Sequence, residues 1–287
     1  MSRSSLAIAL LCLVWGSTWY GIRICLAEQP PLTSAAARFL IAGIATAALV
    51  PVLRRREGLP PPRPWLWMAS GLTNFAGSYG ILYVAEQVVP SGPAAVLWGI
   101  FPLLMAASGA LFLGERLDRR QVLGTLVAFA GIVTVFGGGL GDLDSGNLGH
   151  SLLLLASPFI AATGTTLVKK YGSRTSSLLL NRNGMLFGAG ALAAAAWLTE
   201  DPASARWTAP GVTALVALAL FGTTMSFGIY FWLLRTTPAS RLALITYVTP
   251  IIAMSLGALT GDGTVDTHAW IGTGLVVLGI VLVVRRR

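Results

Sequence analysis

Two apolar segments share a pattern that decides the fold: PAAVLWGIFPLLMAASGALFLGE at residues 93–115 and RLALITYVTPIIAMSLGALTGDG at residues 241–263. Each has a proline in its middle, Pro102 or Pro250, and a Gly-Ala-Leu sequence that begins seven residues later. The two prolines lie 148 residues apart, a little over half of the 287-residue chain. The same spacing relates Gly80 to Gly228, Pro90 to Pro238, Gly124 to Gly272 and Gly131 to Gly279. The sequence therefore contains an internal duplication.

The composition is typical of a membrane protein. Hydrophobic residues make up 55% of the chain and charged residues only 11%, with a mean hydropathy of +0.73, whereas a soluble domain carries roughly 25% charged residues. The net charge of +9 does not indicate nucleic-acid binding, because the basic residues form short clusters between apolar runs. We expect a lipid bilayer and a small-molecule substrate as partners, and no nucleic acid. The sequence leaves the oligomeric state open, and a monomer is compatible with it.

Ten apolar runs are long enough for a helix to cross the hydrocarbon core of a bilayer, which takes about 20 residues. They cover residues 4–24, 32–53, 65–85, 90–113, 120–137, 149–168, 175–198, 210–234, 241–260 and 268–284. We therefore predict an all-α integral membrane protein with ten transmembrane helices. The duplication divides them into two five-helix repeats, residues 1–140 and 148–287. Because five is an odd number, the second repeat is inverted in the membrane, an architecture typical of transporters that work by alternating access.

The connections between the predicted helices alternate in charge. Basic residues gather in every second connection, and most acidic residues lie in the others. The positive-inside rule then places both termini in the cytoplasm.

Four motifs resemble the EamA-type branch of the drug/metabolite transporter superfamily. They are WGSTW (15–19), AAARFLIAG (35–43), a proline-centred fourth helix that ends in LGERL (113–117), and a glycine-spaced fifth helix. The resemblance implies a secondary transporter of the bacterial inner membrane that exports amino acids or related small metabolites, since the family includes aromatic amino acid exporters. The second copy departs from the pattern, because TGDG (260–263) replaces LGER (113–116). No coupling role is therefore assigned to Asp262.

Aromatic residues deep in the predicted spans are candidates for substrate binding. Trp15 and Trp19 lie four residues apart on one helix face, with Thr18 between them in sequence, and Trp98 lies deep in the fourth helix. A belt of interfacial tryptophans does not explain Trp15 or Trp98. They form either packing contacts or an aromatic wall for a ligand with a flat apolar part.

Polar residues within the spans are the second group of candidates. Asn74 and Ser78 are spaced i, i+4 in the third helix, and Tyr79 and Tyr83 lie on an adjoining face. Such groups need partners in a membrane, so they face either neighbouring helices or a water-filled cavity. The second half offers residues at comparable depth: Tyr230, Thr246 and Tyr247.

Two arginines lie inside predicted spans, at equivalent depths of the two repeats. Arg38 is in the outer third of the second helix and Arg182 in the inner third of the seventh. A charge within the membrane costs at least roughly 2.5–3.5 kcal/mol on insertion scales. Each arginine therefore binds a substrate carboxylate, extends toward the headgroups, or bonds a neighbouring helix.

Pro102 and Pro250 are candidate hinges, because a proline inside a helix removes one backbone hydrogen bond and bends the helix. Gly124 and Gly131, and likewise Gly272 and Gly279, are spaced for close packing of helices five and ten.

We expect no metal and no cofactor. The spans hold no Ser/His/Asp order and no paired carboxylates, so we do not expect an enzyme.

Other functions compete with amino acid export. A carrier for nucleotide sugars, phosphorylated sugars or cationic drugs is the alternative within transport, and a channel or a membrane scaffold is the alternative outside it. The few carboxylates within the spans argue against a cation or multidrug site. The few basic groups argue against a polyphosphate site.

Overall fold

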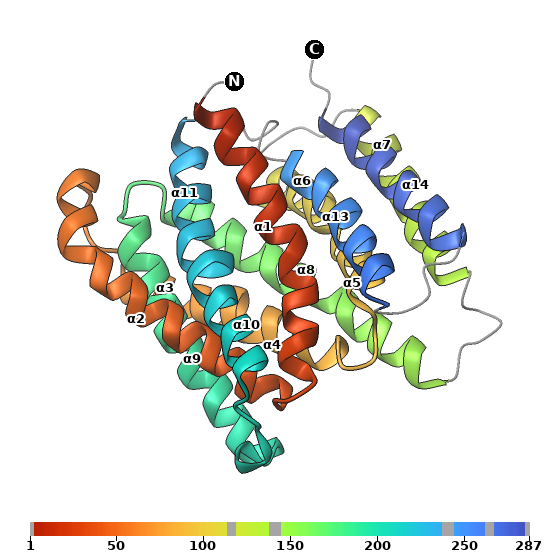
Figure 1. Ribbon diagram of the computed structural model, residues 1–287. Coiled ribbons are helices and arrows are strands. Elements are labelled where there is room, and N and C mark those ends of the chain that lie inside the picture. The colour runs from red at the N-terminus through yellow and green to blue at the C-terminus, as the bar shows by residue number, and fades with distance from the viewer. Residues whose placement is uncertain (1–2, 114–118, 138–144, 237–243, 262–266, 285–287) are drawn as a thin grey trace. The chain divides into compact units, whose positions relative to one another are not determined.

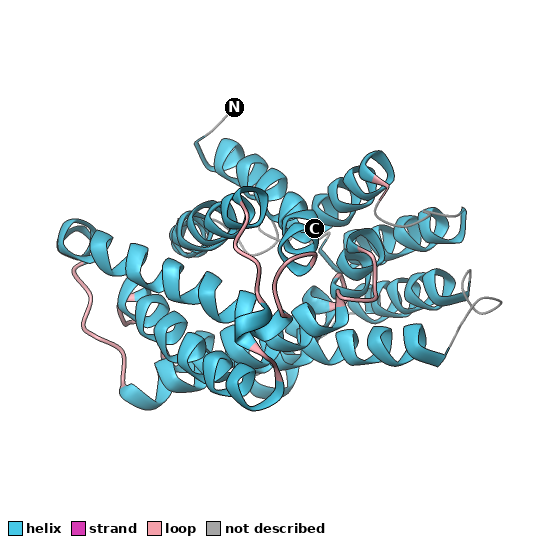
Figure 2. Cartoon of the chain, turned by 60° about the horizontal axis from the view of Figure 1, so that its bottom comes forward, coloured by secondary structure: helices cyan, strands magenta, loops and turns pink. Residues whose placement is uncertain are grey.

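The computed structural model describes residues 3–113, 119–137, 145–236, 244–261 and 267–284. This part of the chain consists of helices and their connections, with no strand in it (Figure 2). Five helical stretches of the described chain are long and apolar enough to cross a membrane, and two of them consist of more than one helix: Ser4–Leu26, Pro31–Arg55, Ser91–Leu113, Leu148–Tyr171 and Ala209–Tyr230. Shorter apolar helices are Val122–Gly131, Val248–Thr260 and Thr267–Gly279. The prediction of an all-α membrane fold is confirmed.

The described helices follow the order of the ten predicted spans. The first half contains α1 (Arg3–Leu26), α2 (Pro31–Glu57), α3 (Pro64–Ser70), the π-helical segment η1 (Gly71–Gly77), α4 (Ser78–Ala85), α5 (Ser91–Trp98), α6 (Phe101–Leu113) and α7 (Arg119–Gly137). The second half contains α8 (Ser145–Tyr171), α9 (Ser177–Thr199), the short 3₁₀ turn η2 (Pro202–Ser204), α10 (Ala209–Ala219), the π-helical segment η3 (Leu220–Met225), α11 (Ser226–Thr236), α13 (Leu244–Thr260) and α14 (Thr267–Val284).

Local sequence signals explain where the helices α2 and α3 begin and where α2 ends. Pro31 and Pro64 are the first residues of α2 and α3, a position where the missing N–H costs nothing. Gly58 ends α2 in the left-handed conformation with φ of 63°, and its N–H donates to Arg54 O. Glycine is favoured at such a helix end, because it adopts positive φ without strain.

Three of the predicted spans are not uniform α-helices. The third and eighth spans each contain a π-helical segment, η1 and η3, and these segments nearly coincide when the chain is shifted by 148 residues. The fourth span divides into α5 and α6 at Gly99 and Ile100, two residues before Pro102. Pro250, in contrast, lies inside the continuous helix α13.

The chain forms two compact units, and each draws on both halves of the sequence. Unit 1 comprises residues 1–20, 88–158 and 232–287, and unit 2 comprises residues 21–87 and 159–231. The helices α1, α8 and α11 contribute residues to both units.

In unit 2, α2 and α9 lie side by side and antiparallel (Figure 1), and a glutamate at the C-terminal end of each helix caps the N-terminus of the other. Glu200, after α9, accepts hydrogen bonds from Leu32 N and Thr33 N at 2.7 and 2.9 Å. Glu57, at the end of α2, accepts bonds from Ser177 N and Ser177 Oγ at 3.0 and 2.6 Å. A carboxylate at a helix N-terminus satisfies free N–H groups and the helix dipole. This reciprocal pattern matches the antiparallel arrangement expected of inverted copies.

In unit 1, α7 and α14 pack backbone to backbone (Figure 1). A Cβ placed on Gly131 would meet Val276 N at 2.6 Å and Gly272 O at 2.7 Å. A Cβ on Gly279 would likewise meet backbone atoms of α7. The predicted close packing of helices five and ten through glycines is confirmed.

Candidate functional site

Arg38 is an almost completely buried charged side chain of unit 2, with 1% of its surface exposed. Its Nε donates to Thr223 Oγ1 at 3.0 Å, and its Nη1 donates to Tyr83 Oη at 3.2 Å. Arg38 therefore bonds two other spans and does not extend toward the headgroups. Of the roles that the sequence left open, only helix bonding and substrate binding remain.

The π-helical segment η3 positions the hydroxyl that Arg38 contacts. Thr223 Oγ1 donates to Leu218 O, five residues earlier, at 2.9 Å. Ser226 Oγ reaches Phe221 O over the same interval at 2.6 Å. Threonine and serine hydroxyls normally bond the carbonyl three or four residues before them, so the wider π turn changes which carbonyls are accessible. Segments of this kind occur frequently at functional sites.

Aromatic rings surround the guanidinium of Arg38. Its Cζ lies 5.0 Å from the centroid of the Tyr79 ring and 5.7 Å from that of Phe39. Phe39 packs edge-on against Tyr79 at 4.9 Å and against Phe75 at 5.3 Å. Phe75 in turn meets Phe227 at 5.7 Å. Ring faces attract a cation, more strongly where water is excluded.

The hydrogen-bond partners of Arg38 within the described part of the chain are neutral. Its two hydrogen bonds end on the hydroxyl groups of Thr223 and Tyr83, and the fully buried carboxylate of Glu86 belongs to the same unit. Burying an ion costs several kcal/mol unless a counter-ion and hydrogen bonds offset the loss of water. An anionic ligand group would supply a counter-ion that bonds the guanidinium directly.

The other predicted residues of unit 2 lie in different surroundings. Asn74 accepts from Thr165 Oγ1 at 3.1 Å and donates to Ser70 Oγ at 3.2 Å. Ser78 is buried in α4, and Tyr230 is half-buried in α11. Arg182 donates twice to its neighbour Asn183, at 2.9 and 2.7 Å. The two arginines that looked equivalent in the sequence therefore differ, because only Arg38 bonds residues of other helices.

The predicted tryptophans belong to unit 1. The rings of Trp19 and Trp98 meet edge-on at 6.5 Å, and Trp98 stacks on Phe101 at 4.8 Å. Trp98 Nε1 donates to the buried Ser157 Oγ at 3.0 Å. Trp15 is half-buried, and its carbonyl accepts from Thr18 Oγ1 at 2.8 Å. The structure thus brings Trp19 and Trp98 together.

The remaining candidates are outside this group of contacts. Thr246 and Tyr247 belong to α13, but their side chains lie outside the described residues. Pro102 is the second residue of α6, directly after the break in the fourth span.

Sequence reasoning missed Thr223 and Ser157. The only available signal was a hydroxyl inside an apolar run, as in LFGTTM at residues 220–225.

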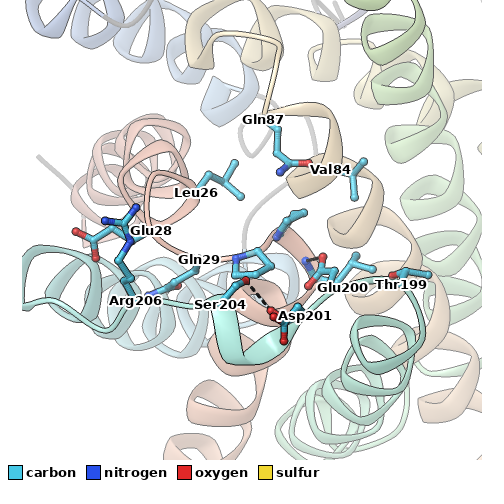
Figure 3. Close-up of a pocket in the computed structure, with 13 residues that line it drawn as sticks. Leu26, Glu28, Gln29, Val84, Gln87, Thr199, Glu200, Asp201, Ser204 and Arg206 are labelled. Carbon is cyan, nitrogen blue, oxygen red and sulfur yellow. Dashed lines mark hydrogen bonds between the residues drawn. The ribbon is translucent and has the colours of Figure 1, made fainter.

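An open pocket of about 570 Å³ lies at one end of unit 2 (Figure 3). It is lined by Leu26, Glu28, Gln29, Pro30, Pro31, Leu32, Val84, Gln87, Thr199, Glu200, Asp201, Ser204 and Arg206. None of the predicted site residues lines it, and the Glu200 carboxylate is already bonded to the start of α2. We assign it no role in substrate binding.

Comparison with known proteins identifies the family. The EamA-like transporter family matches residues 2–137 and, a second time, residues 148–285. The chain belongs to the EamA-like transporter family. It is similar to YedA of Escherichia coli K12, named an uncharacterized inner membrane transporter, with 34% identity over 96% of this chain and 89% of that protein. It is also similar to the uncharacterized transporter YvbV of Bacillus subtilis, with 29% identity over 98% of this chain and 92% of YvbV.

A solved crystal structure also shares the fold. It has a TM-score of 0.71 and 22% identity, and the match covers 98% of this chain and 96% of that one.

From the family match and its relatives, the EamA-family protein is a multi-pass membrane transporter of the inner membrane. The relatives are named transporters, which fits a protein that moves solutes rather than one that transforms them.

Proposed function

We propose that this EamA-family transporter exports amino acids or related small metabolites that carry a carboxylate. The observation that carries this proposal is the buried Arg38, whose only hydrogen-bond partners in the described chain are hydroxyls. Arginine pairs with carboxylates through parallel N–H bonds. The rings of Tyr79, Phe39 and Phe75 give the apolar part of such a solute a surface to contact.

We further propose that transport proceeds by alternating access between two inverted repeats, residues 1–140 and 148–287. The duplication of the family match and the antiparallel α2–α9 pair support this mechanism. The alternation of charge supports cytoplasmic termini. Accessibility tags at both termini and in residues 58–63 should report the cytoplasm, whereas tags in residues 142–147 should report the opposite side. A C-terminus on the opposite side would contradict the inverted arrangement.

Counterflow in proteoliposomes tests the substrate class. Purified protein is reconstituted with one unlabelled solute inside, and uptake of the labelled solute is measured. We expect counterflow with zwitterionic amino acids, aromatic ones included, and none with their amides, which lack the carboxylate. Counterflow of nucleotide sugars, phosphorylated sugars or cationic drugs in place of amino acids would reject the proposed class and leave the family intact.

A further inference from the structure

One end of unit 2 presents exposed basic and aromatic side chains, here called the basic end. It consists of Arg54, Arg55, Arg63, Trp65, Lys169, Lys170, Tyr171 and Arg174. Glu57 is the acidic residue nearest to it in sequence, and its carboxylate accepts hydrogen bonds from Ser176 and Ser177. The surface therefore carries a strong net positive charge.

Specific contacts hold the two chain segments of the basic end together. Ser176 N donates to Pro60 O at 2.8 Å, which joins the connection after α8 to the connection after α2. The rings of Trp65 and Tyr171 meet edge-on at 5.3 Å. Lys170 Nζ lies 5.5 Å from the centroid of the Tyr171 ring. These contacts hold the two segments in place relative to each other, so the basic end is one continuous surface rather than two independent charged loops.

The basic end adjoins helix surfaces that suit hydrocarbon. Val52 and Leu53 are exposed on α2 directly before Arg54, and Met68 and Leu72 are exposed on the span that follows Arg63. Exposed Trp65 and Tyr171 are of the types that sit at headgroup level. The basic side chains therefore lie at the boundary between the hydrocarbon core of the membrane and the lipid headgroups.

We propose that the basic end binds the headgroup of an anionic phospholipid. The basic side chains pair with the phosphate oxygens, while the acyl chains lie along the exposed apolar faces of α2 and α3. Basic clusters at the ends of transmembrane helices recognise anionic headgroups in this way. The binding is independent of which solute is transported.

Lipid titration of the purified full-length protein tests the proposal. Phosphatidylglycerol or phosphatidylcholine is added in neutral detergent, and bound lipid is measured by native mass spectrometry. The test variant combines Lys169→Gln, Lys170→Gln and Arg174→Gln. Its control combines Arg119→Gln and Arg120→Gln, which remove two exposed basic residues of unit 1 where the test variant removes three. A charge-preserving variant combines Lys169→Arg, Lys170→Arg and Arg174→Lys. The wild type and the three variants are first compared for helicity and size.

We expect the wild-type protein to prefer phosphatidylglycerol. Affinity should fall about fivefold for each basic residue removed, and thus about 100-fold in the test variant, with a weaker effect at high salt. The control and the charge-preserving variant should bind like the wild type. Equal binding of both lipids, or unchanged binding by the test variant, would overturn the proposal. Displacement of the lipid by millimolar glycerol phosphate or inorganic phosphate would also overturn it, because it would indicate a site for free anions.

Discussion

Both compact units pack helices through glycines and aromatic rings, but among the described residues unit 2 has more side-chain hydrogen bonds between different spans than unit 1. In unit 1, close backbone contact through Gly131 and Gly279 and the ring cluster of Trp19, Trp98 and Phe101 are joined by one such bond, from Trp98 to Ser157. In unit 2, hydrogen bonds join different spans: Arg38 to Thr223 and Tyr83, Asn74 to Thr165, Thr224 to Ala42 O, and the two glutamate caps.

The difference shows where a substrate can act. Lipid gives helices no hydrophobic reason to associate, so close packing and hydrogen bonds must do so. A close glycine contact offers a solute no polar group. The hydrogen bonds of Arg38, in contrast, can be exchanged for bonds to a carboxylate. We therefore expect substitutions in unit 1 to alter stability first, and substitutions around Arg38 to alter solute recognition first.

The largest effect is expected for Gly279→Ala in unit 1. The new methyl group would meet the backbone of Ala128 and Gly124, which cannot rotate away. Overpacking of this kind should destabilise the protein by about 3 kcal/mol. Gly274→Ala on the same helix is the control, since nothing lies within 4 Å of its Cβ position. Denaturant unfolding in detergent measures both, and equal stability of the two variants would refute the glycine-packing account.

The second prediction concerns Arg38→Gln in unit 2. Glutamine still donates a hydrogen bond toward Thr223 or Tyr83, so the protein should fold, but the positive charge is gone. Loss of one charge-assisted hydrogen bond, worth about 1.5–3 kcal/mol, should raise the half-saturating concentration of an amino acid roughly 10- to 100-fold. Arg182→Gln should have a much smaller effect, because Arg182 bonds its own neighbour Asn183. An equal rise of the half-saturating concentration in both variants would contradict the distinct role of Arg38.

A smaller effect is expected at Thr223. Thr223→Val keeps the shape but removes the hydroxyl that accepts from Arg38 and donates to Leu218 O. Because Thr223 acts on the solute only by orienting Arg38, which keeps its charge and its bond to Tyr83, affinity for the solute should fall by about fivefold, or about 1 kcal/mol. Thr223→Ser retains the hydroxyl and should restore affinity. If serine fails to rescue the variant, packing of the methyl group rather than orientation of Arg38 explains the loss.

Much of this arrangement follows from local sequence, and part of it does not. The apolar runs and the prolines at positions 31 and 64 predict the helices well, because length and N–H chemistry are local properties. The glycine spacing likewise predicts the α7–α14 contact, since both helices carry the same period.

The contact of Arg38 with Thr223 could not be predicted in the same way. The two residues are 185 positions apart, and the hydroxyl reaches Arg38 from a π-helical segment. Nothing in the residue types of LFGTTM distinguishes a π turn from an α turn. The division into two units was also invisible, because α1, α8 and α11 run through it without a linker.

The smallest effects are expected at the paired prolines of unit 1, and here the two copies differ. The span that contains Pro102 is broken at Gly99 and Ile100, whereas Pro250 lies within a continuous helix. Alanine at either position restores an N–H that can bond the carbonyl four residues earlier. At Pro102 this bond would favour closing the break between α5 and α6, and so would stiffen a place where the span can bend during transport.

Pro102→Ala should therefore slow turnover more than Pro250→Ala. Both variants should fold, and both should change the rate by less than the change of about fivefold in affinity that is expected for Thr223→Val. Initial rates of counterflow at matched protein amounts in proteoliposomes measure the difference. Because α13 is already continuous, Pro250→Ala adds a hydrogen bond without joining two helices. A slower rate for Pro250→Ala than for Pro102→Ala would show that the break at Gly99 and Ile100 is not the bending point.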